Sequence, residues 1–172
     1  GGIVRDCLIR ANRAQYGGGA DNRALMQRCD VSFNISEEGG HPFDASDNAG
    51  GVNNCGILDN CVVYGNTACH GWCAGGIANF GDVYNCTVVG NYATPSYGDG
   101  DVFDAAGGIV NWGCVVNTIV VHNEITESFV DSPRFRDNWV SMGATYRYCC
   151  SMPLMDGEGN IAGSPQFMDP GA

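Results

Sequence analysis

Residues 75–91, GGIANFGDVYNCTVVGN, decide the fold of this chain, because the same residue types return at the same offsets elsewhere in it. Residues 50–66 read GGVNNCGILDNCVVYGN, and residues 107–123 read GGIVNWGCVVNTIVVHN. Residues 18–34, GGADNRALMQRCDVSFN, form a fourth and more divergent copy. Copies that begin at Gly-Gly and end at Asn predict a solenoid, in which each copy is one structural unit stacked on the next.

Each copy contains short runs of strand-forming residues separated by glycine and asparagine, which favour turns. Such runs are too short to pair within one copy, but stacked copies would form parallel ladders about 4.8 Å apart. The sequence therefore predicts an all-β fold, a parallel β-helix (β-solenoid) of about five to seven coils with loop insertions on one edge. Because parallel crossovers are almost always right-handed, we expect a right-handed β-helix.

The asparagine that ends each copy sets the register of the coils, and we call it the closing Asn. The predicted coils occupy residues 1–123 and close at Asn12, Asn34, Asn66, Asn91 and Asn123. The first coil begins halfway round, because Gly2 corresponds to Gly56. We expect the closing Asn residues to take left-handed corner conformations and to hydrogen-bond along a column. Residues 124–172 would form a loop and then an irregular coil or a cap of the same domain.

Cysteine recurs five positions before the closing Asn, and valine recurs three positions before it. Side chains two positions apart on a strand share a face, so both columns should point into the solenoid. The predicted cysteine column consists of Cys7, Cys29, Cys61 and Cys86. We expect buried free thiols there, because equivalent side chains of stacked parallel strands are poorly directed to form a disulfide.

Cys69 and Cys73 stand apart from this column, because they flank His70 in the shortest of the segments that join the copies. We expect a local disulfide between these two cysteines. A zinc site is the alternative, but it would need two further ligands, and no matching Cys or His pair lies at the usual spacing.

The segments after the closing Asn vary in length, and we expect 35–49, 67–74, 92–106 and 124–138 to emerge along one edge of the stack. Solenoids often bind ligands at such an edge. Acidic and aromatic side chains there suit carbohydrate, since rings stack on sugar faces and carboxylates accept hydroxyl hydrogen bonds. Solvated loops without a ligand are the alternative. The candidate binding residues are Glu37, Glu38, Asp44, Asp47, Trp72, Tyr97, Asp99, Asp101 and Asp104.

Asp99 and Asp101 are also candidate ligands for Ca²⁺, which prefers oxygen ligands from flexible acidic turns. We expect no other cofactor. Parallel β-helices include polysaccharide lyases and glycoside hydrolases, but the three histidines are scattered, lysine is absent, and the sequence identifies no catalytic residue. His122 stands where other copies have Gly65 and Gly90, so we expect it at a corner. We therefore favour a chain that is not an enzyme, with a lyase or hydrolase as the alternative.

The charge of the chain excludes nucleic acid as a partner. It has 8 basic residues, all arginine, against 19 acidic ones, for a formal net charge of −11. Such a field repels phosphates and anionic lipid. No run approaches the roughly 18 to 20 apolar residues that span a bilayer, so we expect no membrane span in this segment.

Gly-Gly-Ile blocks that close in an aliphatic residue, two others and Asn resemble the surface β-helices of bacterial adhesins, including the polymorphic outer-membrane protein family. Residues 146–169 contain Tyr148-Cys149-Cys150-Ser151, Gly159-Asn160-Ile161 and Ser164-Pro165-Gln166-Phe167. They resemble the terminal coil of large right-handed β-helix proteins of Lentisphaerae, Verrucomicrobia and Planctomycetes, which often end in a choice-of-anchor domain. This resemblance implies secretion or display at the bacterial cell surface, and usually no assigned activity.

Together these features predict a structural or adhesive module at the cell surface that binds extracellular carbohydrate through its loop edge. A second hypothesis is self-assembly, because a solenoid that starts in mid-coil presents unpaired strand edges. The partner at that edge would be another copy added head to tail, which would build a filament, or the rest of a longer parent chain.

Overall fold

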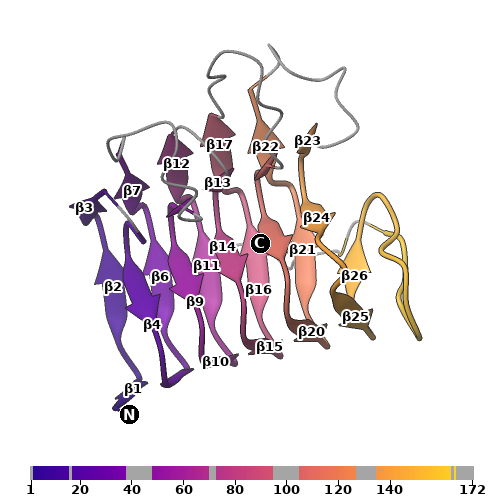
Figure 1. Cartoon of the computed structure of the whole chain (residues 1–172), viewed down its shortest axis with the longest axis horizontal. Helices are drawn as coiled ribbons and strands as arrows, with labels where there is room; N and C mark the ends of the chain where they lie inside the picture. Colours follow the sequence, from indigo (N-terminus) through magenta and orange to yellow (C-terminus); the bar gives the residue numbers. More distant parts are fainter. Residues whose placement is uncertain are drawn as a thin grey trace, which may run out of the picture.

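The computed structural model describes residues 2–15, 17–37, 48–69, 73–94, 105–126, 135–163 and 165. Within these ranges the chain forms short strands and turns, and every strand pairs in parallel with the equivalent strand of a neighbouring coil. The coils stack along the long axis of the molecule, with the N-terminus at one end (Figure 1). The predicted parallel β-helix is therefore confirmed.

Two six-stranded sheets, A and B, run the whole length of the stack, so the described chain makes six coils at these sheets. Sheet A consists of β1 (Ile3–Arg5), β5 (Leu25–Gln27), β10 (Ile57–Asp59), β15 (Asp82–Tyr84), β20 (Cys114–Val116) and β25 (Thr145–Arg147). Sheet B consists of β2 (Leu8–Arg10), β6 (Asp30–Ser32), β11 (Val62–Tyr64), β16 (Thr87–Val89), β21 (Ile119–Val121) and β26 (Cys150–Ser151).

Three further sheets complete each coil, which runs in the order E, D, A, B and C. Sheet C consists of β3 (Arg13–Ala14), β7 (Ile35–Ser36), β12 (Thr67–Cys69), β17 (Tyr92–Thr94) and β22 (Glu124–Ile125). Sheet D consists of β4 (Ala20–Asn22), β9 (Val52–Asn54), β14 (Ile77–Asn79), β19 (Ile109–Asn111) and β24 (Trp139–Ser141). Sheet E consists of β8 (Asn48–Ala49), β13 (Cys73–Ala74), β18 (Ala105–Ala106) and β23 (Phe135–Arg136).

The described part of the chain enters this pathway halfway round a coil. Its first strands, β1 to β3, belong to sheets A, B and C, whereas sheets D and E begin with β4 and β8. This agrees with the correspondence between Gly2 and Gly56. On one side, β1, β2 and β3 therefore have no other described strand beside them.

The interior of sheet B consists of aligned valines and cysteines. Val63 pairs with Val31 on one side and with Val88 on the other, and all three are fully buried. The backbone N–H of Cys61 donates to Cys86 Sγ at 3.4 Å, and equivalent contacts join Cys29 to Cys61 and Cys86 to Thr118 Oγ1. Cys29, Cys61 and Cys86 are thus part of the hydrogen-bonded interior. Cys7, which the sequence placed in the same buried column, is instead exposed, because no described coil covers the first one.

The closing Asn residues form a continuous amide ladder, which is buried from Asn34 to Asn123 and exposed at Asn12. The Oδ1 atom of Asn91 accepts hydrogen bonds from the backbone N–H (3.0 Å) and the Nδ2 group (2.9 Å) of Asn66. The same double contact joins Asn12 to Asn34, Asn34 to Asn66 and Asn91 to Asn123. Each amide is therefore satisfied only if the next coil is in register.

The left-handed corner residue is the one before the closing Asn, not the Asn itself as the sequence suggested. Positive φ angles occur at Ala11, Phe33, Gly65, Gly90 and His122. This offset has a physical reason: the turn bends at the preceding residue, which leaves the Asn amide directed along the stack toward its partners. His122, with φ of 54°, occupies the corner that its match to the two glycines predicts.

The Gly-Gly pair lets two walls of the coil touch. A Cβ atom on Gly75 would lie 2.6 Å from the backbone nitrogen of Tyr92, and one on Gly76 would lie 2.8 Å from Val88 Cγ1. This narrow waist divides the coil into a large lobe, enclosed by sheets A, B and D, and a small lobe between sheets C and E. Ala68, Cys73 and Ala93 are among the buried residues of the small lobe.

The four variable segments are shorter than the sequence suggested. Residues at both ends of these segments belong to strands of sheets C and E, which pair with neighbouring coils. Examples are β12 (Thr67–Cys69) and β13 (Cys73–Ala74). These residues stay in the ladder because their backbone groups find partners there. What lies between consecutive strands of these sheets, residues 38–47, 70–72, 95–104 and 127–134, falls outside the described residues.

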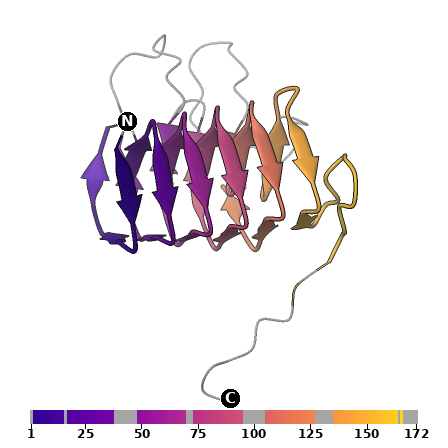
Figure 2. The ribbon, with the colours of Figure 1, turned by 90° about the horizontal axis from the view of Figure 1, so that it is seen from below.

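The end of the stack opposite the N-terminus is covered by residues 152–163, which we call the cap (Figure 2). The regular coils continue to Ser151, so the irregular part begins later than residue 124. Met155 is buried in the large lobe, and the indole N–H of Trp139 donates to the carbonyl of Pro153 at 3.0 Å. Ile161 forms a parallel bridge with Cys150.

Replacing Gly75 with alanine should lower the free energy of unfolding by about 3 kcal/mol or more, because the new Cβ meets backbone atoms that cannot move independently. Gly90→Asn is the matched control. Gly90 has a φ of 63° and open space around its Cα, and asparagine tolerates that conformation, so the loss should stay below about 1 kcal/mol. Urea unfolding measures both, and equal losses would contradict the waist.

Candidate functional site

The predicted binding edge lies almost entirely outside the described residues. Of its candidate residues, the structure describes Glu37 alone; Glu38, Asp44, Asp47, Trp72, Tyr97, Asp99, Asp101 and Asp104 fall outside, together with the candidate Ca²⁺ ligands among them. Glu37 extends the ladder beyond β7: its backbone N–H donates to Ala14 O, and its carboxylate lies 3.1 Å from Arg13 in an exposed ion pair. This carboxylate is therefore already paired.

The points where the chain departs from sheet C and returns to sheet E are aligned from coil to coil. In sheet C, Ser36 pairs with Ala68, which pairs with Ala93, which pairs with Ile125. In sheet E, Asn48 pairs with Cys73, and Ala74 pairs with Ala106. Each variable segment is therefore joined to the same two sheets, one strand spacing of about 4.8 Å from the next.

Cys69 and Cys73 are both free thiols, so the expected disulfide is absent from the structure. The physical reason is the alternation of side chains along β12: Ala68 is the buried inward residue, which turns Cys69 away from the interior that Cys73 occupies. Burial raises the pKa of the Cys73 thiol to about 12. Cys73 is thus a small apolar filler of the small lobe.

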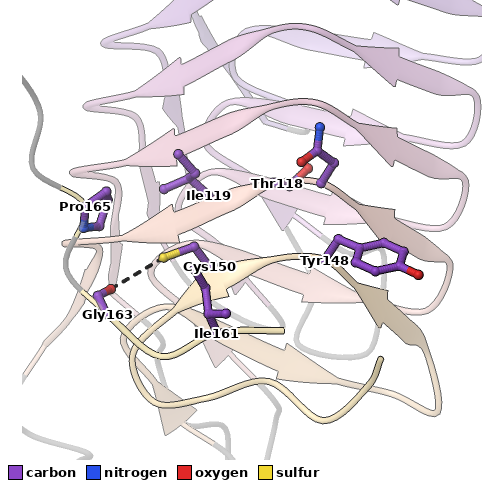
Figure 3. Close-up of a pocket in the computed structure, with 8 residues that line it drawn as sticks. Thr118, Ile119, Tyr148, Cys150, Ile161, Gly163 and Pro165 are labelled. Atoms are coloured by element: carbon purple, nitrogen blue, oxygen red, sulfur yellow. Dashed lines mark hydrogen bonds between the residues drawn. The ribbon is translucent and has the colours of Figure 1, made fainter. Parts of the chain in front are cut away.

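Sequence reasoning missed an open pocket beside the cap, with a volume of about 380 Å³ (Figure 3). It lies between the last strands of sheet B and the returning chain. Ile119, Cys150 and Ile161 supply apolar surface, and Thr118, Tyr148, Gly163 and Pro165 complete the labelled lining. In the sequence, part of this stretch is marked by a family resemblance, but no pocket is predicted there. Nothing in the spacing of its residues shows that the chain turns back onto β26.

The polar groups of this pocket are already hydrogen-bonded. Thr118 Oγ1 donates to Val116 O at 3.0 Å, and Tyr148 OH donates to Glu158 Oε1 at 3.1 Å. The bond to Glu158 raises the pKa of the Tyr148 hydroxyl. Cys150 Sγ lies 3.6 Å from the carbonyl oxygen of Gly163. Among the described lining residues no base lies beside the thiol, so the pocket is better described as the joint between cap and coils.

The exposed corner between sheets A and B carries a polar ladder that serves the fold. Asp59 accepts hydrogen bonds from Gln27 Nε2 at 2.7 Å and Asn85 Nδ2 at 2.9 Å, and these bonds, that from Asn85 foremost, lower the pKa of Asp59. Asn117 Nδ2 continues the ladder to Asn85. At the N-terminal end Arg28 forms two contacts with the Asp6 carboxylate, of 2.7 and 2.8 Å. These carboxylates are paired along the stack rather than gathered around a cleft.

In three comparisons, the chain matches no protein-family model, no curated protein and no solved structure. The described residues contain no cluster of three or more His, Cys, Asp or Glu side chains placed to hold a metal ion. In the same ranges no helix is long and apolar enough to cross a bilayer.

Thiol labelling should separate the cysteines by burial. At mildly alkaline pH, exposed Cys7 and Cys55 should react with iodoacetamide at least about 100-fold faster than buried Cys73 and Cys86. Burial raises the pKa of the Cys73 thiol, and the hydrogen bond with the Cys61 thiol, together with burial, raises that of Cys86. Mass spectrometry of the labelled peptides measures the rates. Denatured protein, in which all the thiols should react alike, is the control, and fast labelling of Cys86 in the native chain would contradict the stacked interior.

Proposed function

We propose that this chain is a structural and adhesive module of an extracellular bacterial surface protein, and that it binds glycan through the edge between sheets C and E. One observation carries the proposal: every variable segment is joined to the same two sheets, in register with its neighbours. The coils thus act as a rigid support that holds in a row the points where the segments leave sheet C and rejoin sheet E.

The composition of the segments supports a carbohydrate ligand. In sequence, the segments contain the aromatic residues Trp72 and Tyr97 and the acidic residues Asp99, Asp101 and Asp104. A row of segments rooted about one strand spacing apart suits an extended polymer, because several weak contacts along one chain add up through effective concentration. The strongly acidic net charge of −11 favours neutral or cationic sugars over acidic ones.

The support itself is suited to a mechanical role. The closing Asn ladder, the thiol and valine columns and five parallel sheets run along the same axis, so nearly every coil is held by the same contacts on both sides. Stacked repeats of this kind behave as extended, quasi-one-dimensional bodies. The module would then hold the binding edge at a fixed distance from its attachment.

Affinity electrophoresis in gels containing neutral or acidic polysaccharides tests the binding. The chain should be retarded by at least one neutral polysaccharide, and combined Trp72→Ala and Asp99→Asn substitutions should weaken retardation by about tenfold, which corresponds to about 1.4 kcal/mol. Asp82→Asn, on the outer face of sheet A and away from the edge, is the matched control and should leave retardation unchanged.

Two results would contradict the proposal. One is equal retardation of the edge variant, the control and the unchanged chain. The other is the appearance of new reducing or unsaturated ends in the polysaccharide, lost on replacing Asp99 and Asp101, which would establish a lyase or hydrolase instead.

A further inference from the structure

The interior of sheet B contains a run of thiols that repeat at one strand spacing. Cys29, Cys61 and Cys86 occupy the same position in three successive coils, and all three are buried. In each of them, Sγ contacts the backbone carbonyl oxygen two residues earlier, at 3.3, 3.3 and 3.1 Å. The three side chains therefore point the same way, and each sulfur lies over the next at about 4.8 Å, the spacing of the strands.

This spacing is too wide for a disulfide between neighbouring coils. A disulfide needs Cβ atoms about 3.5–4.5 Å apart and sulfur atoms about 2 Å apart, whereas equivalent atoms of the column repeat at about 4.8 Å. The spacing suits a bridging metal ion instead. Metal–thiolate bonds are about 2.3 Å long, so two such bonds in line span about 4.6 Å. An ion with two ligands in line thus fits between one sulfur and the next.

The number of ligands selects the kind of ion. Structural zinc takes four ligands, and each gap in this column offers two. Soft monovalent ions such as Cu(I) and Ag(I) bind thiolates and are stable with two ligands in line. Such an ion needs no converging group of three ligands, which the described ranges lack. The column therefore matches a soft monovalent ion in both spacing and ligand type.

The surroundings of the sulfurs favour their charged form. The backbone N–H of Cys29 donates to Cys61 Sγ at 3.3 Å, and that of Cys61 donates to Cys86 Sγ at 3.4 Å. Hydrogen bonds donated to a thiolate stabilise it relative to the thiol. The hydrogen bond between the Cys61 and Cys86 thiols also lowers the pKa of Cys61. The thiols thus interact with one another along the column, and two of them already have donors for a negative charge.

We propose that Cys29, Cys61 and Cys86 bind soft monovalent cations, Cu(I) or Ag(I), with one ion in each gap between successive sulfurs. Cys61 is then shared by both ions. The three thiols release their three protons to water, and three thiolates with two monovalent ions keep one negative charge, which the N–H donors partly offset. The ions enter as the chain folds, before the interior closes, and they join successive coils through the core.

Thr118 interrupts the column and shows which substitutions it accepts. The backbone N–H of Cys86 donates to Thr118 Oγ1 at 3.3 Å, and Oγ1 donates to Val116 O at 3.0 Å, so the hydroxyl repeats the contacts of a thiol. In the next coil, Cys149 is again a buried thiol, 3.2 Å from the carbonyl oxygen two residues earlier. Threonine therefore fits this position, and a cysteine in place of Thr118 would connect Cys86 to Cys149.

Loading with Ag(I) during refolding tests the proposal, because this ion is soft and does not oxidise thiols. The full chain is refolded with Ag(I) in a background in which the cysteines outside the interior are replaced with serine: Cys7, Cys55, Cys69, Cys114 and Cys150. After desalting, elemental analysis should find about two Ag(I) ions per chain, and X-ray absorption should show two sulfur ligands for each. The midpoint of thermal unfolding should rise by at least about 4 °C.

Substitutions in the same background separate a shared column from thiols that bind singly. Cys61→Thr should remove both ions, because it leaves Cys29 and Cys86 two strand spacings apart, whereas Cys29→Thr should remove one. Thr118→Cys should raise the count to about four ions, because it places five thiols in succession.

Three results would overturn the proposal. The first is a folded background chain that holds no Ag(I). The second is the loss of one ion from Cys29→Thr and Cys61→Thr alike, which would show that each thiol binds on its own. The third is a count in Thr118→Cys that exceeds the background by one ion or less. This third measurement decides the matter even where a threonine variant fails to fold, because it depends on a gain.

Discussion

The buried amide of each closing Asn after Asn12 is the interaction on which the rest of the structure depends. Its oxygen accepts two hydrogen bonds from the previous coil, and its nitrogen donates both to the next Asn and to a backbone carbonyl such as Val31 O. A buried amide without partners costs about 1–3 kcal/mol for each unsatisfied group. Coils of different length therefore stack in the same register, with each closing Asn over the next. The valine and cysteine columns are aligned in consequence, because a one-residue slip would turn their side chains outward.

The Gly-Gly waist packs directly against this amide ladder from the opposite side of the coil. Because the glycines have no Cβ, the start of sheet D rests directly on the closing Asn and on the first residue of sheet C. The waist separates a wide, hydrophobic lobe from a narrow one that holds alanine and cysteine. Variation in length is confined to the narrow lobe, where sheet C gives way to sheet E, so it does not disturb the ladder.

The repeating parts of the fold could be predicted because each coil reuses the same contacts at the same offsets. Val63, Cys61 and Asn66 lie where their spacing from one another places them. The corner conformation was assigned one residue too late, because sequence cannot distinguish a residue that bends the chain from its neighbour that fills the bend. The sequence allowed a cap within residues 124–172 but gave neither its bounds nor its contacts, since it occurs once, and Asn138 continues the ladder from a position that is glycine in other copies.

The candidate site was less predictable than the fold for a related reason. Residues that bind a ligand need not repeat, so their positions carry no periodic signal, and only composition marked the edge between sheets C and E. The position of Cys69 and Cys73 in the chain suggested a disulfide, whereas alternation along β12 and β13 decides where their side chains point.

The most direct test of the central claim compares Asn66→Ala with Asn12→Ala in urea unfolding. Removing the Asn66 side chain strips two buried donors of Asn34 of their acceptor, so the free energy of unfolding should fall by about 3 kcal/mol or more. Asn12 is exposed in the first described coil and no described residue donates to its oxygen, so its loss should cost less than about 1.5 kcal/mol. Equal and small losses at both positions would show that the amide ladder does not hold the coils in register.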